Sequence, residues 1–563
     1  MHVVGLCSGR QVPRETPMRH RRTLAFVCMS AALVSRAGAQ EQHSHHGASE
    51  ALGSVHFPVA CETGVQATFT RAVALLHSFG YEEARKSFAK VGEQDPSCGM
   101  AAWGIAMTYY HPIWAPPTAA ELGAGAAAAD RASAVGAGTD REKRYLTAIG
   151  AFYRDFGRVD HRTRALAYKE AMEDLARRYP DDHEASAFYA LALLGAAAPG
   201  DAAFAAQKQA ADILNGLLMK EPQHPGAIHY LIHAYDYPSL AAMALPAART
   251  YAKIAPSSPH ALHMPSHIFT RLGLWPESIE SNLASADAAR RLVARTYPGA
   301  ASFDALHALD YLEYAYLQTG NEPKARQVRE DAATARKFDD PNFAAGYALA
   351  AIPARFALEH RRWDEAATLE APDASLPWQN FPYARAITQF ARALGSARGG
   401  EPKRAYAPLA NLEEIHATLV KSPVPGPYDW AGQVDSMRLA AAAWVAYSEG
   451  HRSEAVDLAR TAADLEDRVG KHPVTPGGVL PARELLADLL REMGQADEAL
   501  QQYEASLSVA PNRFNGLYGA AQSAEASGDS RKATQYYAML AQNCSSSDRT
   551  EVKRARDFLE RHK

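Results

Sequence analysis

Long apolar runs and strand signals are the two features that this chain of 563 residues most clearly lacks. After residue 39, no segment approaches the roughly 18 consecutive apolar residues that a membrane-spanning helix needs. From Val65 onward the alternating pattern of a β-strand is nearly absent, and the hydrophobic spacing is almost wholly helical. These absences predict an all-α chain with no transmembrane segment beyond residue 39.

The sequence also lacks the short motifs of several large enzyme classes. It contains no His-Glu-x-x-His, no Gly-x-Ser-x-Gly, no Gly-Lys-Ser/Thr phosphate loop and no Cys-x-x-Cys pair. Standard hydrolase, kinase and thiol-redox chemistry therefore has no support in this chain. If the protein is an enzyme, we expect metal-centred chemistry, in which a bound ion polarises a substrate oxygen, activates water or changes oxidation state.

The amino-terminal end has the features of an export signal. Starting at Met18, a cluster of three arginines precedes an apolar run from Leu24 to Val34, and Ala37-Gly38-Ala39 follows as a cleavage site. The mature chain is therefore expected to begin near Gln40. The sequence predicts that residues 1–39 are a signal peptide and leader, and that the protein is periplasmic or secreted.

Neither a basic surface nor many cysteines remain in the expected mature chain. Removing residues 1–39 leaves 53 basic and 62 acidic side chains, a formal charge of −9, which disfavours nucleic acid as a partner. Three cysteines remain. A disulfide between Cys61 and Cys98 is expected, because export favours oxidation and the pair would fasten the first helical hairpin to the next. Two buried thiols are the alternative, and Cys544 has no evident partner.

Helical hairpins repeat along the chain with a recurring set of small and large residues. The pattern is clearest in Gly494, Ala499, Tyr503 and Pro511, then in Gly528, Ala533 and Tyr537, and it recurs at Ala84, Phe88 and Pro96. It resembles the tetratricopeptide repeat, in which small residues let helices approach, large ones fill the gaps and a proline ends the second helix. The resemblance covers residues 65–560 and implies an all-α, helical-hairpin solenoid. It points to an exported, bacterial-type member of the family with a divergent, histidine-rich middle section.

Four regions are expected along the chain. After the signal peptide, residues 40–64 form a polar segment with three histidines between residues 43 and 46, and it has too few apolar residues to fold alone. Residues 65–370 form an amino-terminal lobe with the histidine-rich groove. Residues 383–563 form a carboxy-terminal lobe, and the irregular stretch from Pro372 to Pro382 divides the two lobes.

Two histidine pairs in the middle of the chain carry the strongest functional signal. His229 and His233 are four residues apart, and His263 and His267 repeat this spacing after 34 residues, the length of one tetratricopeptide unit. A spacing of four puts both rings of a pair on one helical face, with Cβ atoms roughly 5–6 Å apart. Because the pairs occupy equivalent places in neighbouring hairpins, we expect the four imidazoles to converge.

Four converging imidazoles favour a transition-metal ion. Zinc, copper and iron all accept imidazole ligands, and the sequence does not distinguish between them. The resemblance implies that the first helix of each repeat lines the concave groove and that these histidines point into it. Four further residues could bind the ion or orient the ligating rings: Asp236, His260, His307 and Asp310. No general base can be identified, and Asp236, Asp310 and Glu313 are the nearest candidates.

Pro265 interrupts the second of these expected helices. A proline inside a helix removes a hydrogen bond, so it predicts either a kink or a helix that begins at Pro265 and leaves His263 outside. Two other interpretations of the histidines also stay open. They could hydrogen-bond an extended peptide in a groove that contains several tyrosines, or they could serve packing alone.

The sequence thus predicts an exported tetratricopeptide-like solenoid whose concave groove carries a histidine-rich transition-metal site, with catalysis left open. The alternative is a non-catalytic scaffold that uses the same groove to bind a peptide or a partner protein, as most proteins of this architecture do. Fold alone does not distinguish the two functions.

Overall fold

The computed structural model describes residues 50–113, 116–198, 200–371, 376–426 and 428–562. The expected signal peptide, the cleavage point near Gln40 and the three histidines between residues 43 and 46 lie outside these residues, as does part of the stretch at 372–382. Export and the division into two lobes therefore stay predictions.

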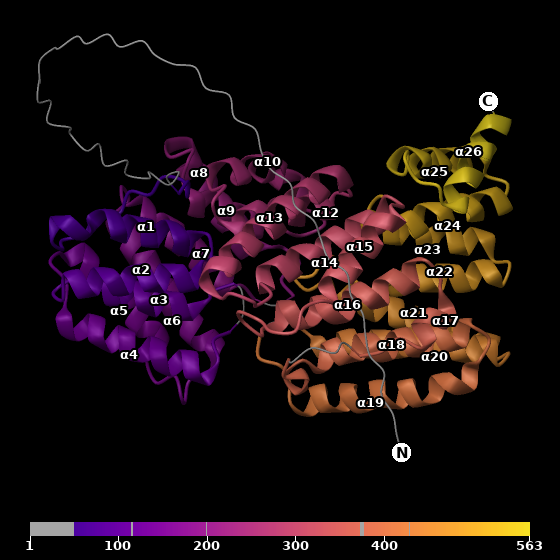
Figure 1. Ribbon diagram of the computed structural model, residues 1–563, viewed down its shortest axis with the longest axis horizontal. Helices are drawn as coiled ribbons and strands as arrows, with labels where there is room; N and C mark the ends of the chain where they lie inside the picture. The colour runs from indigo at the N-terminus through magenta and orange to yellow at the C-terminus, as the bar shows by residue number, and fades with distance from the viewer. Residues whose placement is uncertain (1–49, 114–115, 199, 372–375, 427, 563) are drawn as a thin grey trace, which may run out of the picture. The chain divides into compact units, whose positions relative to one another are not determined.

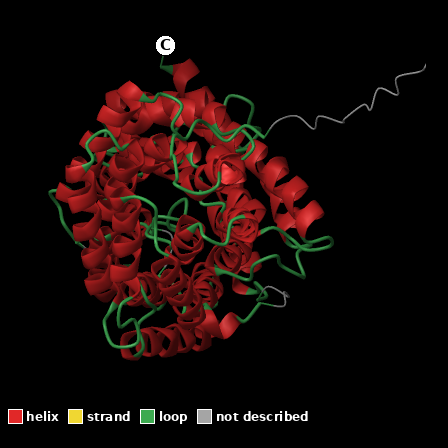
Figure 2. Ribbon diagram, turned by 90° about the vertical axis from the view of Figure 1, so that its left-hand side faces the viewer, coloured by secondary structure: helices red, strands yellow, loops and turns green. Residues whose placement is uncertain are grey.

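The described residues are helical almost throughout. They form 26 α-helices and four short 3₁₀ helices, and Figure 2 shows helices and the loops that connect them. The one β-type contact in the described part of the chain is an isolated bridge between Ala301 and Phe338. None of these helices combines the length and apolar character needed to cross a membrane. The expected all-α fold is confirmed.

Figure 1 labels all of the α-helices except α11. The first thirteen are α1 Gln66–His77, α2 Tyr81–Gln94, α3 Gly99–Tyr110, α4 Ala119–Val135, α5 Asp140–Tyr153, α6 His161–Arg178, α7 His183–Gly195, α8 Ala205–Lys220, α9 Pro225–Tyr235, α10 Leu245–Ile254, α11 Pro259–His263, α12 Pro265–Arg271 and α13 Trp275–Thr296. The others are α14 Phe303–Gln318, α15 Glu322–Ala332, α16 Phe343–Glu359, α17 Trp363–Ala367, α18 Pro382–Arg398, α19 Tyr406–Lys421, α20 Trp430–Ser448, α21 Arg452–Val469, α22 Ala482–Glu492, α23 Ala496–Val509, α24 Phe514–Ala526, α25 Ser530–Asn543 and α26 Thr550–Arg561. The 3₁₀ helices are Thr63–Val65, Ala241–Ala244, Trp378–Asn380 and Pro402–Ala405.

Local sequence signals set several helix ends. The Thr118 side chain accepts the backbone N–H of Glu121, whose carboxylate accepts the N–H of Thr118, so α4 begins with a capping box. Pro225 and Pro259 occupy the first positions of α9 and α11, where a missing N–H costs nothing. Gly494, between α22 and α23, has a φ of +80°, a backbone conformation that favours glycine.

Consecutive helices pack against each other, and some helices also touch the next but one, as α3 touches α5 and α22 touches α24. Small residues permit the close approaches. A Cβ on Gly104 would lie 2.4 Å from the Phe88 ring, and one on Gly519 would lie 2.2 Å from the Tyr503 ring. Phe88 and Tyr503 are large residues of the expected repeat motif. This order of neighbours is that of a helical-hairpin solenoid, so the expected architecture is confirmed.

A buried cluster of charges joins the middle helices to those near the carboxyl end. The Arg513 guanidinium, at the start of α24, donates to Glu359 and to Glu484, each at 2.6 Å. It also donates to the Tyr314 hydroxyl at 2.7 Å. Because these partners lie on α16, α22 and α14, residues far apart in the sequence are held together around one side chain.

Cys61 and Cys98 lie at disulfide distance, with their sulfurs 2.03 Å apart. Cys61 precedes the first helices and Cys98 directly precedes α3, so the pair ties the segment ahead of α1 to the start of the second hairpin. The pairing expected from the sequence is geometrically in place. Cys544 is a buried thiol outside this pair.

Candidate metal centre

The second histidine pair spans a break between two short helices. α11 ends at His263 and α12 begins at Pro265. Of the two outcomes expected from the proline, a kink or a new helix, the chain therefore shows a new helix that begins at Pro265. Met264 between them keeps right-handed helical angles, φ −51° and ψ −36°. The chain path therefore stays helical through the break, and the Nε2 atoms of His263 and His267 come within 3.0 Å.

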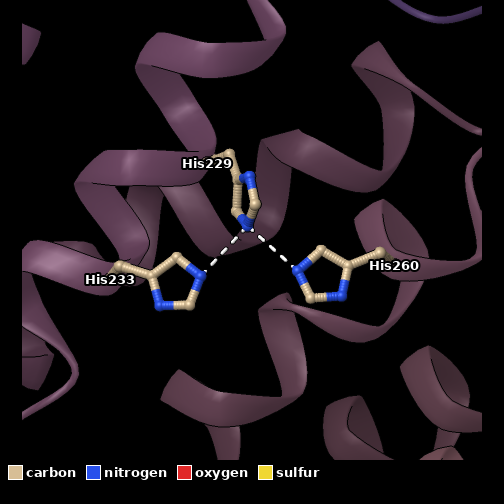
Figure 3. A group of neighbouring side chains, drawn as sticks. All are labelled: His229, His233 and His260. Atoms are coloured by element: carbon tan, nitrogen blue, oxygen red, sulfur yellow. Dashed lines mark hydrogen bonds between the residues drawn. The ribbon is translucent and has the colours of Figure 1, made fainter. Parts of the chain in front are cut away.

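The first histidine pair is completed by a ring from the next hairpin. His229 and His233 lie on α9, one turn apart, and His260 lies on α11. Figure 3 shows the His229 ring between the other two, with its Nε2 atom 3.1 Å from the Nε2 atoms of both His233 and His260. Three imidazole nitrogens from two helices thus meet at one point, which we call the first histidine group.

The second pair is completed in the same way. His263 and His267 are joined by His307 of α14, whose ring centroid lies 4.2 Å from that of His263. We call these three residues the second histidine group. In each group, one ligand atom per residue can be chosen so that all three atoms lie within 4.8 Å of one another.

The six rings therefore form two groups of three, whereas the sequence led us to expect the four paired rings around one ion. The repeat spacing places the pairs at equivalent points of neighbouring hairpins, but each pair takes its third ring from the hairpin that follows. His260 and His307, expected as supplementary residues, are full members of these groups.

The two groups are immediate neighbours. The His233 ring centroid lies 6.4 Å from that of His267, and the His260 centroid lies 6.4 Å from that of His263. Within the first group the centroids of His233 and His260 are 6.5 Å apart. Rings of different groups are therefore as close as the outer rings of a single group.

Three of the six rings have an oxygen partner for the nitrogen that faces away from their group. Nδ1 of His229 donates to the backbone carbonyl of His77 at 2.6 Å. Nδ1 of His263 donates to Oδ1 of Asn282 at 2.7 Å, and Nδ1 of His267 donates to Asp236 at 3.0 Å. Such outer partners fix the tautomer of a ligating histidine and leave its Nε2 lone pair for a metal.

Burial holds the six imidazoles neutral. It lowers the pKa of every one of them, and the pKa of His229 falls to about 3. Five of the rings are almost completely buried, and His233 is partly buried. Neutral imidazole is the form that binds a metal, so these rings need not lose a proton at neutral pH.

Asp236 orients His267. One of its oxygens accepts from His267, and the other accepts from Nε of Arg271 at 2.8 Å. Nζ of Lys471 lies 3.7 Å away, and burial lowers the pKa of Lys471 to about 7. Burial alone would raise the pKa of Asp236, but the charges of Lys471 and Arg271 outweigh burial and hold the pKa well below its usual value. The carboxylate is therefore ionised, and it hydrogen-bonds the ring of His267, which is the geometry of the orienting role among the two roles expected for it.

Asp310 and Glu313 face an arginine. Nη1 of Arg355 donates to Asp310 at 2.7 Å and to Glu313 at 3.1 Å, and all three side chains are buried. This pairing differs from the sequence-based expectation that Asp310 could bind the ion or orient a ring. Burial raises the pKa of Asp310 and of Glu313 in spite of the nearby guanidinium.

The connection between α21 and α22, residues 470–481, lies against the second histidine group, and we call it the covering segment. The backbone carbonyl of Thr475 accepts from the Tyr311 hydroxyl at 3.0 Å, and the Tyr311 ring stacks on that of His267 with centroids 4.9 Å apart. Lys471, beside Asp236, belongs to the same segment. A part of the chain far beyond the histidine pairs in the sequence thus helps to bury them.

A third buried cluster with potential ligands adjoins the first group. Nε2 of His77 lies 2.7 Å from Glu184, and Nε2 of His224 lies 3.2 Å from the other oxygen of the same carboxylate. The His77 ring also contacts the Tyr230 hydroxyl at 2.9 Å. This cluster adjoins the first group through His77, whose backbone carbonyl accepts from Nδ1 of His229.

Most of the groups that hydrogen-bond these rings carry no signal in the sequence. Asn282 lies on α13 and Lys471 lies far beyond His267 along the chain, and no local spacing marks either of them. The carbonyl of His77 is a backbone group, which no side-chain motif can reveal. Only Asp236, close to the first pair in the sequence, was among the expected residues.

Comparisons with known proteins add little to this geometry. No family model and no curated protein sequence matches the chain. Among solved structures, the chain is similar to the crystal structure of yeast Tom70, with 10% sequence identity and a TM-score of 0.32, over 88% of this chain and 95% of the other. A likeness at this level identifies neither a family nor a function for the chain.

Proposed function

We propose that this protein binds transition-metal ions, one in each of its two histidine groups. The observation that carries the proposal is the contact between His263 and His267, whose Nε2 atoms lie 3.0 Å apart. Each of these nitrogens bears a lone pair that points at the other, and a shared cation is what makes such an arrangement stable.

The tautomers of both rings follow from their outer partners. The Asp236 carboxylate can only accept, so the hydrogen of neutral His267 lies on Nδ1. Asn282 donates through Nδ2 to the backbone carbonyl of Ser278 at 2.7 Å, which turns its Oδ1 toward His263. The hydrogen of neutral His263 therefore also lies on Nδ1. With both Nε2 atoms bare, a direct hydrogen bond between them is impossible without an added proton.

A proton is a poor candidate for that shared cation. Burial lowers the pKa of His263 well below its ordinary value and lowers that of His267 as well, so an imidazolium is disfavoured at neutral pH. A metal ion can bind to the same lone pairs, and each group would provide three imidazole ligands. Three protein ligands also leave a position open for a small molecule, the arrangement found in catalytic zinc sites.

Burial favours metal binding over the alternative of a peptide groove. A groove that recognises a peptide must present its side chains to the solvent before the peptide arrives. Here five of the six rings are almost fully buried, and the covering segment lies against the second group. A scaffold function would have to use another surface of the solenoid.

Export is the second element of the proposal. It is supported by the basic cluster, apolar run and cleavage site within residues 1–39, and by the pairing of Cys61 with Cys98, since disulfides persist in oxidising compartments. Cell fractionation and amino-terminal sequencing test it. We expect a periplasmic or secreted chain that begins near Gln40, and a cytoplasmic chain that keeps the segment before Gln40 would contradict export.

Metal content of the untagged mature protein tests the binding proposal. We expect two ions per chain after reconstitution with zinc, copper or iron, and one ion after the substitution His263→Ala, which leaves the first group intact. His183→Ala serves as the control, because His183 is a partly exposed histidine that pairs with Glu221 away from both groups. A chain that binds no stoichiometric metal under any of these conditions would contradict the proposal and favour a non-catalytic scaffold.

A further inference from the structure

The two histidine groups share one short helix, and this keeps the two groups close together. His260 belongs to the first group and His263 to the second, and both lie on α11. Residues three apart on a helix have Cβ atoms roughly 5–6 Å apart, and these two ring centroids are 6.4 Å apart. Two ions held by these rings would be near enough to share a ligand.

We propose that the two ions are copper and that they form one coupled centre, which binds dioxygen between them. The inference rests on the proposed function, because it needs both histidine groups to hold metal. It adds the identity of the ions, the coupling between them and the class of their ligand, a small diatomic molecule.

Charge argues for copper. The six histidines would bind the ions as neutral imidazoles. The nearby carboxylate of Asp236, which is hydrogen-bonded to His267, already faces Arg271 and Lys471 and so offers little further negative charge. Two adjacent divalent ions would add four positive charges to a buried site that offers little compensation, and uncompensated buried charge is costly. Two Cu(I) ions would add only two charges. Copper is the metal that both accepts imidazole and has a stable monovalent form.

Access argues for a small ligand. The rings of His229, His260 and His263 are almost completely buried, so a substrate of many atoms could not reach ions between them without displacing the surrounding helices or the covering segment. A diatomic molecule needs no such displacement. The space between the groups is bounded by the ring pairs His233–His267 and His260–His263, whose centroids lie 6.4 Å apart in each pair, so a ligand shared by the two ions would have to be small.

The reaction balances without any other reactant. Each Cu(I) ion gives one electron to dioxygen, whose double bond becomes the single bond of a peroxide that bridges the two resulting Cu(II) ions. One bond forms between each copper and the peroxide, and no proton is transferred. The reverse reaction releases dioxygen. The two negative charges of the bridge offset the two positive charges that the ions gain, so the net charge of the buried site is unchanged.

Anaerobic loading followed by admission of oxygen tests the inference on the untagged mature protein. The metal-free protein is loaded with Cu(I), freed of unbound copper and exposed to a measured amount of dioxygen. We expect two copper ions per chain, uptake of one dioxygen per two coppers, and an X-ray absorption edge that moves from Cu(I) to Cu(II). The electron paramagnetic resonance signal should account for only a minor part of the copper, because the two unpaired electrons couple through the bridge.

The outcomes separate this inference from the proposed function. Two oxidised coppers that give a full electron paramagnetic resonance signal would overturn the coupling. Copper that stays monovalent in air would overturn dioxygen binding. Either result leaves the proposal of metal binding intact. Stoichiometric zinc or iron with no binding of Cu(I) would overturn the identity of the ions. A chain that binds no metal would overturn both proposals together.

Single-ring variants provide the matched comparison. His260→Ala and His307→Ala each remove one ligand from one group, and each should lose dioxygen uptake. After chemical oxidation the copper that remains in the intact group should give a full, uncoupled resonance signal. His183→Ala should behave as the unmodified protein, and circular dichroism confirms that every variant is folded. Normal dioxygen uptake by both ligand variants would overturn the inference.

Discussion

The side chains of Asp236 and His267 form a carboxylate–imidazole pair, with Oδ2 accepting from Nδ1 at 3.0 Å. Replacing the carboxylate by an amide, Asp236→Asn, keeps the size of the side chain and removes its charge. We expect metal affinity at the second group to fall by roughly 10- to 100-fold, as is usual when an outer partner of a ligating histidine is lost. Competition with a chelator measures the change. Unaltered affinity in a folded variant would show that Asp236 has no part in orienting the ring.

Pro265 separates α11 from α12, and replacing it should affect the site more than the fold. The substitution Pro265→Ala restores a backbone N–H, so the two short helices can join and straighten. The distance between His263 and His267 would then change, and we expect weaker metal binding with a thermal midpoint that is unchanged or higher. Metal titration alongside thermal unfolding checks both parts. Unchanged affinity would count against any role for the break.

The spacing of the histidines made much of this site predictable. A separation of four within each pair and of 34 between pairs places the rings on equivalent faces of neighbouring hairpins, and His229 and His233 do meet at their Nε2 atoms. The same reasoning brought in His260 and His307. Repeats are favourable for such inference, because local periodicity sets both the helix face and the order of neighbours.

The division of six rings into two groups could not be read from the sequence. It depends on which neighbouring helix supplies the third ring, and that choice follows from helix packing. Asn282 reaches His263 because α13 packs against α11, and Lys471 reaches Asp236 because a connection from the far end of the chain lies there. Contacts of this range arise from tertiary structure and leave no mark in local spacing.

The Tyr311 hydroxyl joins the second histidine group to the covering segment, and its removal should loosen that cover. Tyr311→Phe keeps the ring that stacks on His267 and deletes the bond to the Thr475 carbonyl. Loss of one hydrogen bond is worth about 1 kcal/mol, so we expect metal to leave up to about fivefold faster. Stopped-flow mixing with a chelator gives the rate. An unchanged rate would mean that the covering segment does not limit release.

The Cys61–Cys98 pair should stabilise the amino-terminal hairpins. The two residues are 37 apart in the sequence, and a bond that closes a loop of this size typically contributes about 2–4 kcal/mol by restricting the unfolded chain. Denaturant unfolding of the exported protein should therefore shift to lower denaturant when a reductant is added. The double substitution Cys61→Ser with Cys98→Ser should show the lower midpoint and no response to reductant. If the denaturant midpoint of the unmodified protein does not change when reductant is added, the two cysteines are not joined by a disulfide.

Asp488 should contribute to stability above about pH 4 and lose that contribution in acid. Burial alone would raise its pKa, but the charge of Arg361 and two further arginines, with the hydrogen bond from Tyr503, lowers the pKa to about 2. A folded-state pKa below the unfolded value means that the carboxylate stabilises the fold above the unfolded pKa, and that this stabilisation disappears as the pH falls through the folded pKa. The shift corresponds to roughly 2 kcal/mol. Asp488→Asn should therefore lower the free energy of unfolding at pH 7 by at least this amount and should approach the unmodified protein near pH 2. Denaturant titrations across this pH range make the comparison, and a difference that stays constant down to pH 2 would show that the stabilisation does not come from the ionised carboxylate.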